Sequence, residues 1–71
     1  MRRVEIVLNN VEAHRKQHAL TQEQLAQAVT VTRQTVIAIE KGNYVPSVLL
    51  ALRLARCFGV NVEEVFWYEG Q

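Results

Sequence analysis

The chain has 71 residues, of which 49% are apolar and 21% are charged, and its formal net charge is +1. This length suits one domain with a small core, and the near-zero charge excludes a polybasic or strongly acidic tail. The sequence has no aspartate, one serine and one cysteine. A hydrolytic triad or an aspartate-based metal site is therefore disfavoured, and an intrachain disulfide cannot form. No apolar run approaches the about 20 residues of a membrane-spanning helix. We expect a small cytoplasmic domain that is neither an enzyme nor a membrane protein and has no cofactor.

The segment before residue 9 differs in pattern from the rest of the chain. Val4, Ile6 and Leu8 alternate with the residues between them, which is the period of a β-strand. A lone strand leaves its backbone groups unsatisfied, and the easiest partner in so helical a domain is the same strand of a second copy. The alternative is a frayed arm or an upstream extension of the first helix, and both interpretations stay open.

Caps and stop signals divide the remainder into five expected helices. Thr21, Thr32, Ser47 and Asn61 suit helix N-caps, whereas Gly42 and Gly59 suit helix ends. The expected helices cover residues 10–18, 22–29, 33–41, 48–58 and 62–67. Only two residues separate the second helix from the cap of the third. These two helices must therefore cross at a steep angle.

The fourth and fifth segments carry more apolar residues than one core-facing stripe requires. In the fourth segment we expect the core stripe to consist of Val48, Ala51, Leu52, Ala55 and Phe58. Excess apolar surface on a small domain usually marks an interface. We expect the homodimer interface to draw on Val4, Ile6, Leu8, Trp67 and Tyr68. The alternative for Trp67 is that it closes the core of its own chain.

Residues 20–42, LTQEQLAQAVTVTRQTVIAIEKG, resemble the Cro/repressor-type helix-turn-helix (lambda-repressor-like) family of transcriptional regulators. The resemblance continues over nearly the whole chain and is strongest to short stand-alone regulators. It implies an all-α fold, a compact five-helix DNA-binding domain over residues 10–69. Residues 1–9 form an N-terminal arm that can be a short β-strand.

The family pattern also assigns internal roles. Ala26 stands where a small residue lets the two crossing helices approach, and Val36 and Ile39 face the core. Arg15 and Glu40 match a pair that commonly forms an internal salt bridge in the family. The chain departs from the pattern at His14, where a larger apolar residue or tyrosine is usual, in the alternating arm before residue 9, and at Thr30, where the turn usually carries glycine. A left-handed backbone there would strain threonine.

The resemblance makes residues 33–41 the helix that enters the major groove of DNA. An arginine guanidinium can form two hydrogen bonds with O6 and N7 of guanine, and a glutamine side-chain amide can form two with N6 and N7 of adenine. We expect the base-contacting residues to be Arg33, Gln34, Ile37 and Ala38. We expect the DNA backbone to be contacted by Gln22, Thr32, Thr35, Lys41, Asn43 and Tyr44.

These features predict a sequence-specific regulator of transcription that binds double-stranded DNA, most simply a repressor. One reading helix contacts too few base pairs to define a site in a genome. We therefore expect a homodimer on a pseudo-palindromic operator, in the cytoplasm of a prokaryotic cell and associated with its nucleoid or with phage DNA. No small-molecule ligand is evident. The competing hypothesis is a protein-interaction module, such as an antitoxin-like or adapter subunit, whose C-terminal aromatic residues hold a partner.

His14 and His18 lie four residues apart, which is a metal-ligand spacing on a helix. No third ligand is evident nearby except Glu12 or a distant Cys57. We therefore predict packing or surface histidines and no metal.

Overall fold

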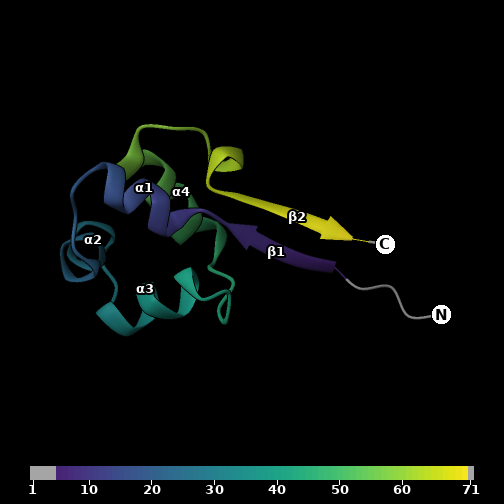
Figure 1. Ribbon diagram of the computed structural model, residues 1–71, viewed down its shortest axis with the longest axis horizontal. Helices are drawn as coiled ribbons and strands as arrows, with labels where there is room; N and C mark the ends of the chain where they lie inside the picture. The colour runs from purple at the N-terminus through teal and green to yellow at the C-terminus, as the bar shows by residue number, and fades with distance from the viewer. Residues whose placement is uncertain (1–4, 71) are drawn as a thin grey trace.

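The computed structural model describes residues 5–70 and shows four α-helices and two strands within that range. The elements in chain order are β1 (Glu5–Asn9), α1 (Val11–Gln17), α2 (Gln22–Val29), α3 (Arg33–Glu40), α4 (Val48–Phe58), the 3₁₀ turn η1 (Val62–Glu64) and β2 (Phe66–Gly70). The helices form a bundle, and β1 and β2 form a two-stranded ribbon that projects from one side of it (Figure 1). Among the described residues, no helix has the length and apolar character to cross a membrane.

The helix ends follow from the caps that the sequence contains. The Thr21 hydroxyl accepts the Gln24 N–H at 3.0 Å, and the Gln24 side chain accepts the Thr21 N–H at 2.9 Å, which completes a capping box. Ser47 caps α4 in the same way through the Leu50 N–H at 3.1 Å. Gly59 ends α4 with φ +71°, a left-handed conformation that glycine adopts without strain. The predicted boundaries of α2 and α4 are confirmed.

The core lies where the four helices and η1 meet. Leu25 and Val29 of α2 and Val36 and Ile39 of α3 are at most 1% exposed, and the sequence predicted this core-facing side for α3. Val11 at the start of α1 and Val65 after η1 complete the core near the base of the ribbon. Burial of each of these side chains stabilises the fold by about 1.5–3 kcal/mol relative to leaving the side chain exposed to water.

The predicted core stripe of α4 is wrong at its N-terminal end. Val48 is 76% exposed and Leu52 is 51% exposed, whereas Leu50 and Leu54 are buried beside Ala55 and Phe58. Leu50, Leu54 and Phe58 are spaced at i, i+4 and i+8, which also describes one side of a helix. Because α4 is apolar on more than half of its circumference, the spacing alone allowed either stripe.

The predicted fifth helix is also wrong, so the fold over residues 5–70 is mostly helical as expected but has four helices and a two-stranded sheet instead of five helices alone. Only the 3₁₀ turn η1 forms, and residues 66–70 extend as β2. β2 pairs antiparallel with β1, so that Leu8 lies opposite Trp67 and Ile6 lies opposite Glu69. Aromatic residues favour such a half-buried pleated surface. The strand expected in the arm is present, but its partner belongs to the same chain and not to a second copy. Val4 lies outside the described residues.

Asn9 fixes the base of the ribbon to the bundle. Its side-chain oxygen accepts the Val11 N–H at 3.1 Å, at the start of α1. Its side-chain nitrogen donates to the carbonyl of Ile39 at 2.9 Å, in the last turn of α3. The neighbouring Asn10 N–H donates to the Val65 carbonyl at 3.1 Å, just before β2. The ribbon is therefore joined to the ends of three elements.

Candidate nucleic-acid interface

The turn between α2 and α3 brings the two helices together at close range. Ala26 has no exposed surface, and its carbonyl accepts the Val31 N–H at 2.9 Å across the turn. Thr30 ends α2 with φ +64° and ψ +49°, a left-handed conformation in a β-branched residue. The expected turn therefore forms with threonine at the position where the family usually has glycine, and the backbone of Thr30 is strained.

The outward side of α3 presents the residues expected to contact bases. Arg33 and Gln34, in its first turn, are exposed, whereas Ile37 and Ala38 are half-buried beside them. The Thr32 hydroxyl accepts the Thr35 N–H at 3.3 Å and therefore caps this helix. Because Val36 and Ile39 face the core, the polar first turn of α3 is left free to meet a ligand.

A chain of hydrogen bonds lies behind this surface and joins α1, α2 and α3. The Arg15 Nε donates to Glu40 Oε2 at 2.6 Å, in the ion pair that the sequence suggested. The Gln22 amide nitrogen donates to the other Glu40 oxygen at 3.1 Å. The Arg33 guanidinium in turn donates to the Gln22 amide oxygen at 3.3 Å. Arg33 is therefore held in place by Gln22, which is itself held by the ion pair.

The ion pair is well shielded from solvent. The side chains of Arg15 and Glu40 are 11% and 5% exposed. The hydrogen bond that Arg15 donates to Glu40 raises the pKa of Arg15 against the opposing effect of burial, and the negative charge of Glu40 raises it further. Arg15 also donates to the Leu20 carbonyl at 3.0 Å, so the guanidinium connects α1 to the segment before α2. Both charges are thus compensated within the fold.

The link between Gln22 and Arg33 could not be seen in the sequence. We expected Gln22 to point at the DNA backbone, but its side chain is half-buried and both ends of its amide are engaged within the protein. Gln22 and Arg33 are the first residues of α2 and α3. The steep crossing of the two helices, which brings these first turns together, was the one available signal.

A surface hollow of about 430 Å³ opens beside this network. It is lined by Glu12, Arg15, Lys16, Thr21, Gln22, Glu23 and Arg33. The hollow lies at the N-terminus of α2, where free backbone N–H groups and the helix dipole favour an anion. Three cationic side chains and two glutamates, Glu12 and Glu23, line it, and Glu12 lies 3.9 Å from Lys16, so the positive potential of the hollow is partly cancelled. The arrangement suits a phosphate group of a nucleic-acid backbone.

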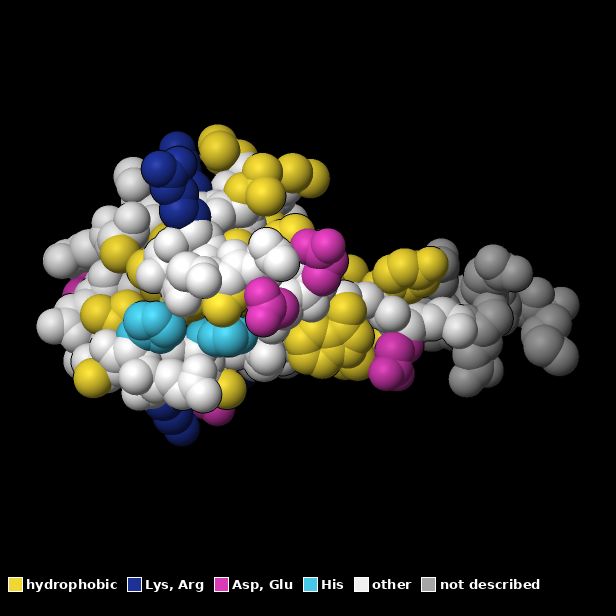
Figure 2. All heavy atoms as spheres, turned by 90° about the horizontal axis from the view of Figure 1, so that it is seen from above, with side chains coloured by type: hydrophobic (Ala, Val, Ile, Leu, Met, Phe, Trp, Pro, Cys, Tyr) yellow, Lys and Arg dark blue, Asp and Glu magenta, His cyan; other side chains and the backbone are white. Residues whose placement is uncertain are grey.

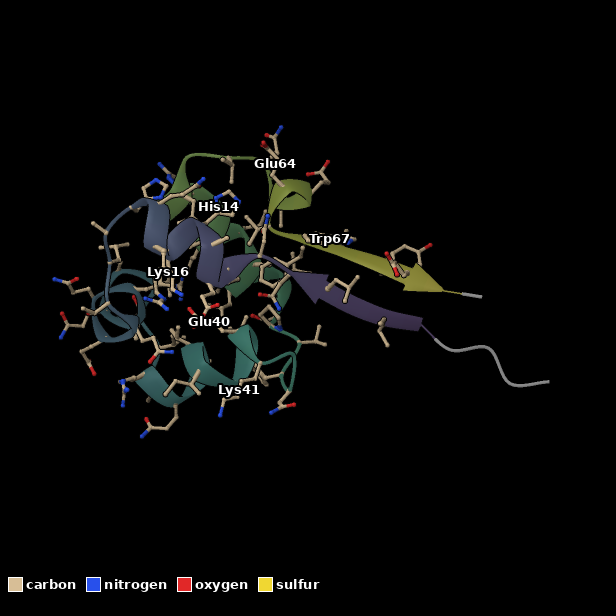
Figure 3. All side chains as sticks on the ribbon, in the orientation of Figure 1. His14, Lys16, Glu40, Lys41, Glu64 and Trp67 are labelled. Atoms are coloured by element: carbon tan, nitrogen blue, oxygen red, sulfur yellow. The ribbon has the colours of Figure 1, made fainter. Side chains whose placement is uncertain are left out.

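The remaining residues expected to contact the DNA backbone lie at the two ends of α3. Thr32 is exposed and Thr35 half-buried, and their hydroxyls lie 3.1 Å apart, so each is partly satisfied within the protein. Lys41, Asn43 and Tyr44 follow the helix and are exposed (Figure 3 labels Lys41). α3 therefore has polar or cationic side chains at both ends of its exposed face.

The residues expected at a dimer interface lie on the ribbon, apart from Val4, which is outside the described residues. Ile6, Trp67 and Tyr68 are 51%, 42% and 68% exposed, and Leu8 is half-buried. The sequence indicated excess apolar surface on the fourth segment but not which residues form it, and Val48, Leu49 and Leu52 of α4 are all more than half exposed. Figure 2 shows yellow side chains both on the projecting ribbon and at one edge of the bundle.

The two histidines pack against the core. The ring of His14 stacks on Phe58 with centroids 5.1 Å apart, and His18 lies 5.5 Å from the same ring. His14 Nε2 lies 3.2 Å from the Glu64 carbonyl oxygen, which Figure 3 places on the same side of the bundle. The prediction of packing histidines is confirmed. Residues 5–70 contain no cluster of three histidine, cysteine or acidic side chains that could hold a metal ion.

Comparisons with known proteins agree with this geometry. The model of the helix-turn-helix family matches residues 11–65. The chain is 52% identical to YgzD of Bacillus subtilis strain 168, named as an uncharacterised HTH-type transcriptional regulator, over 86% of this chain and 92% of that protein. A regulator of the same description from Methanocaldococcus jannaschii shows the same identity and coverage. Among solved structures, the restriction-modification controller protein C.AhdI of Aeromonas hydrophila is similar, with a TM-score of 0.71 and 28% identity over 76% of this chain and 82% of that chain.

Proposed function

The chain belongs to the helix-turn-helix family of transcriptional regulators, and from this premise we propose that α3 reads the major groove of an operator. The observation that carries the proposal is the position of Arg33. It is exposed in the first turn of α3, the part of the motif that reaches base edges, and its guanidinium is oriented by Gln22. An oriented arginine loses less freedom when it forms two hydrogen bonds with guanine.

The other exposed residues receive roles that follow from their positions. Gln34 can pair with adenine, and Ile37 and Ala38 can contact thymine methyl groups beside it. Phosphates would be met by Lys41, Asn43 and Tyr44 at one end of α3 and by the hollow at the N-terminus of α2 at the other. Thr32 and Thr35 lie between these two groups. Gln22 acts mainly on Arg33 and reaches a phosphate only if its amide turns.

We further propose that the protein is a repressor that acts as a homodimer. A DNA-binding surface that occupies a promoter blocks transcription without any further contact, which makes repression the simplest outcome. Two copies related by a two-fold axis would read a pseudo-palindrome with half-sites about 34 Å apart. In a prokaryotic cell this DNA lies in the nucleoid region of the cytoplasm, where we place the protein.

Selection of bound sequences from random duplex DNA tests this function directly. The expected result is one enriched motif with two-fold symmetry. If no motif is enriched at physiological salt, the proposal that α3 reads an operator is wrong. The hypothesis of a protein-interaction module then replaces it.

Variants at Arg33 of α3 and at Lys41, which directly follows α3, separate base reading from phosphate binding. Arg33→Ala and Arg33→Lys should both reduce the preference for one base at one position of the site by about 1–3 kcal/mol. Lysine keeps the positive charge but cannot form the two parallel hydrogen bonds of a guanidinium group. Lys41→Ala should weaken binding to all sequences alike and reduce the slope of affinity against salt by about one. If Arg33→Lys keeps full sequence preference, Arg33 acts only as a charge near the backbone.

A further inference from the structure

The exposed large apolar side chains of the described residues fall on only two surfaces. The ribbon surface consists of Ile6, Val7, Trp67 and Tyr68. The second surface, which we name the α4 patch, consists of Val45, Val48, Leu49 and Leu52, with Tyr44 beside it. Exposures of these eight residues range from 37% to 76%. Single exposed apolar residues need no explanation, but two such groups on a small domain indicate surfaces that are covered in the working assembly.

The ribbon cannot be covered by its own bundle. Residues opposite each other across two paired strands share a face. One face therefore carries Leu8 and Trp67, and the other carries Val7 and Tyr68. Figure 1 shows the ribbon extending away from the helices, so both faces project beyond the core of the chain. A two-stranded ribbon is marginal on its own and is stabilised by packing against another element.

The two surfaces have complementary charges at their borders. From residue 42 to residue 52 no side chain is charged, and the next residues along the outer side of α4 include the exposed Arg53 and Arg56. From residue 57 to residue 70 there are three glutamates, Glu63, Glu64 and Glu69, and no lysine or arginine. The α4 patch thus has a basic border, and η1 with β2 gives the ribbon an acidic border on the β2 side, whereas Arg2 and Arg3 precede β1 in the sequence.

We propose that the two surfaces cover each other between two copies of the chain, so that each ribbon lies on the α4 patch of the other copy. This inference rests on the homodimer proposed above and assigns its interface. A contact of patch with patch would bring arginines together, whereas reciprocal packing places Arg53 and Arg56 toward the glutamates of η1 and β2. A two-fold axis forms this contact twice and buries the α4 patch and one face of the ribbon of each copy in one interface.

Two variants that alter one surface each provide the test. The patch variant is Val48→Lys with Leu49→Lys, and the ribbon variant is Ile6→Lys with Tyr68→Lys. All four side chains are more than half exposed, so the bundle core is untouched, which circular dichroism checks. In sedimentation equilibrium without DNA, each variant should dissociate at least a hundred-fold more readily than the unaltered chain. The matched control, Gln17→Lys with Gln27→Lys, adds the same charge at exposed positions of α1 and α2 and should remain dimeric.

Mixing the two variants distinguishes reciprocal packing from contact between like surfaces. A mixed pair keeps one intact contact, between the ribbon of the patch variant and the patch of the ribbon variant. Fluorescence energy transfer between labelled variants should therefore show association at least ten-fold tighter than that of either variant alone. If either variant stays dimeric, or if the mixture does not associate, the assigned interface is wrong. If the unaltered chain is monomeric, both the assigned interface and the homodimer are wrong. Base reading by α3 is tested separately, by the selection of bound sequences from random duplex DNA.

Discussion

At the scale of single residues, the ion pair between Arg15 and Glu40 decides whether the reading helix is held in place. Glu40 accepts hydrogen bonds from Arg15 and from Gln22, and Gln22 in turn orients Arg33. The pair is nearly excluded from water, so its attraction is offset by the cost of removing two charges from solvent. Its main effect is on geometry, because it fixes the positions of α1, α2 and α3 relative to one another.

Removing one partner of this pair should destabilise the protein far more than removing both. Arg15→Met leaves the Glu40 carboxylate buried with one remaining donor, and we expect a loss of about 3 kcal/mol in the free energy of unfolding. Arg15→Met with Glu40→Met replaces both charges by apolar side chains of similar size and should recover most of this loss. Urea denaturation at one fixed protein concentration measures both. A double variant as unstable as the single one would contradict this account.

Thr30 is a second residue whose conformation has a measurable cost. Its φ of +64° is strained for a β-branched side chain, and glycine adopts it freely. Thr30→Gly should therefore raise the free energy of unfolding by about 1 kcal/mol, after the greater freedom of glycine in the unfolded chain is counted. Ala19 has φ +54° and no β-branch, so Ala19→Gly should gain less. Thermal unfolding followed by circular dichroism compares the two, and a fall in the melting temperature of Thr30→Gly would show that this strain is not significant.

At the scale of elements, the features that the sequence predicted correctly are those set by residues close together in the chain. The limits of α2 and α4 depend on caps that act over three residues, at Thr21 and Ser47, and these limits were predicted correctly. The strand state of β2 could not be predicted in this way, because it depends on pairing with β1, about 60 residues earlier. The buried side of α4 was ambiguous for another reason, since Leu52 and Leu54 fit apolar stripes equally well and only the position of the other helices selects one.

Within the candidate site, the outward side of α3 followed from its periodicity, whereas the contact of Gln22 with Arg33 depends on how two helices cross.

Asn9 couples two elements, and one substitution can separate its two hydrogen bonds. Asn9→Asp keeps an oxygen for the Val11 N–H but has no donor for the Ile39 carbonyl. We expect it to lower the free energy of unfolding by about 1 kcal/mol, the net value of one such bond. The amide of Gly42, which donates to the same carbonyl, should exchange its hydrogen faster. Asn43→Asp makes the same chemical change at an exposed position and should alter neither property. Unchanged exchange at Gly42 in the Asn9 variant would mean that the ribbon does not support the end of α3.

At the scale of the whole molecule, one chain carries one reading helix, so the spacing of half-sites depends on how two copies are joined. The reciprocal contact of ribbon and α4 patch would fix the two α3 helices at one separation and one rotation about the DNA axis. A rigid pair gains affinity because the second half-site is bound at a high effective concentration, and this gain is lost when geometry forbids both contacts.

Insertion of five base pairs at the centre of the selected operator should therefore abolish most of the binding. The insertion turns one half-site to the opposite side of the duplex, since about ten base pairs complete a turn. We expect affinity to fall about a hundred-fold or more, to that of one half-site, as measured by gel shift at constant salt. The control operator carries the same five base pairs outside the half-sites and should bind as before. If the central insertion leaves the affinity unchanged, the two reading helices are not held rigidly, and each copy recognises its half-site independently.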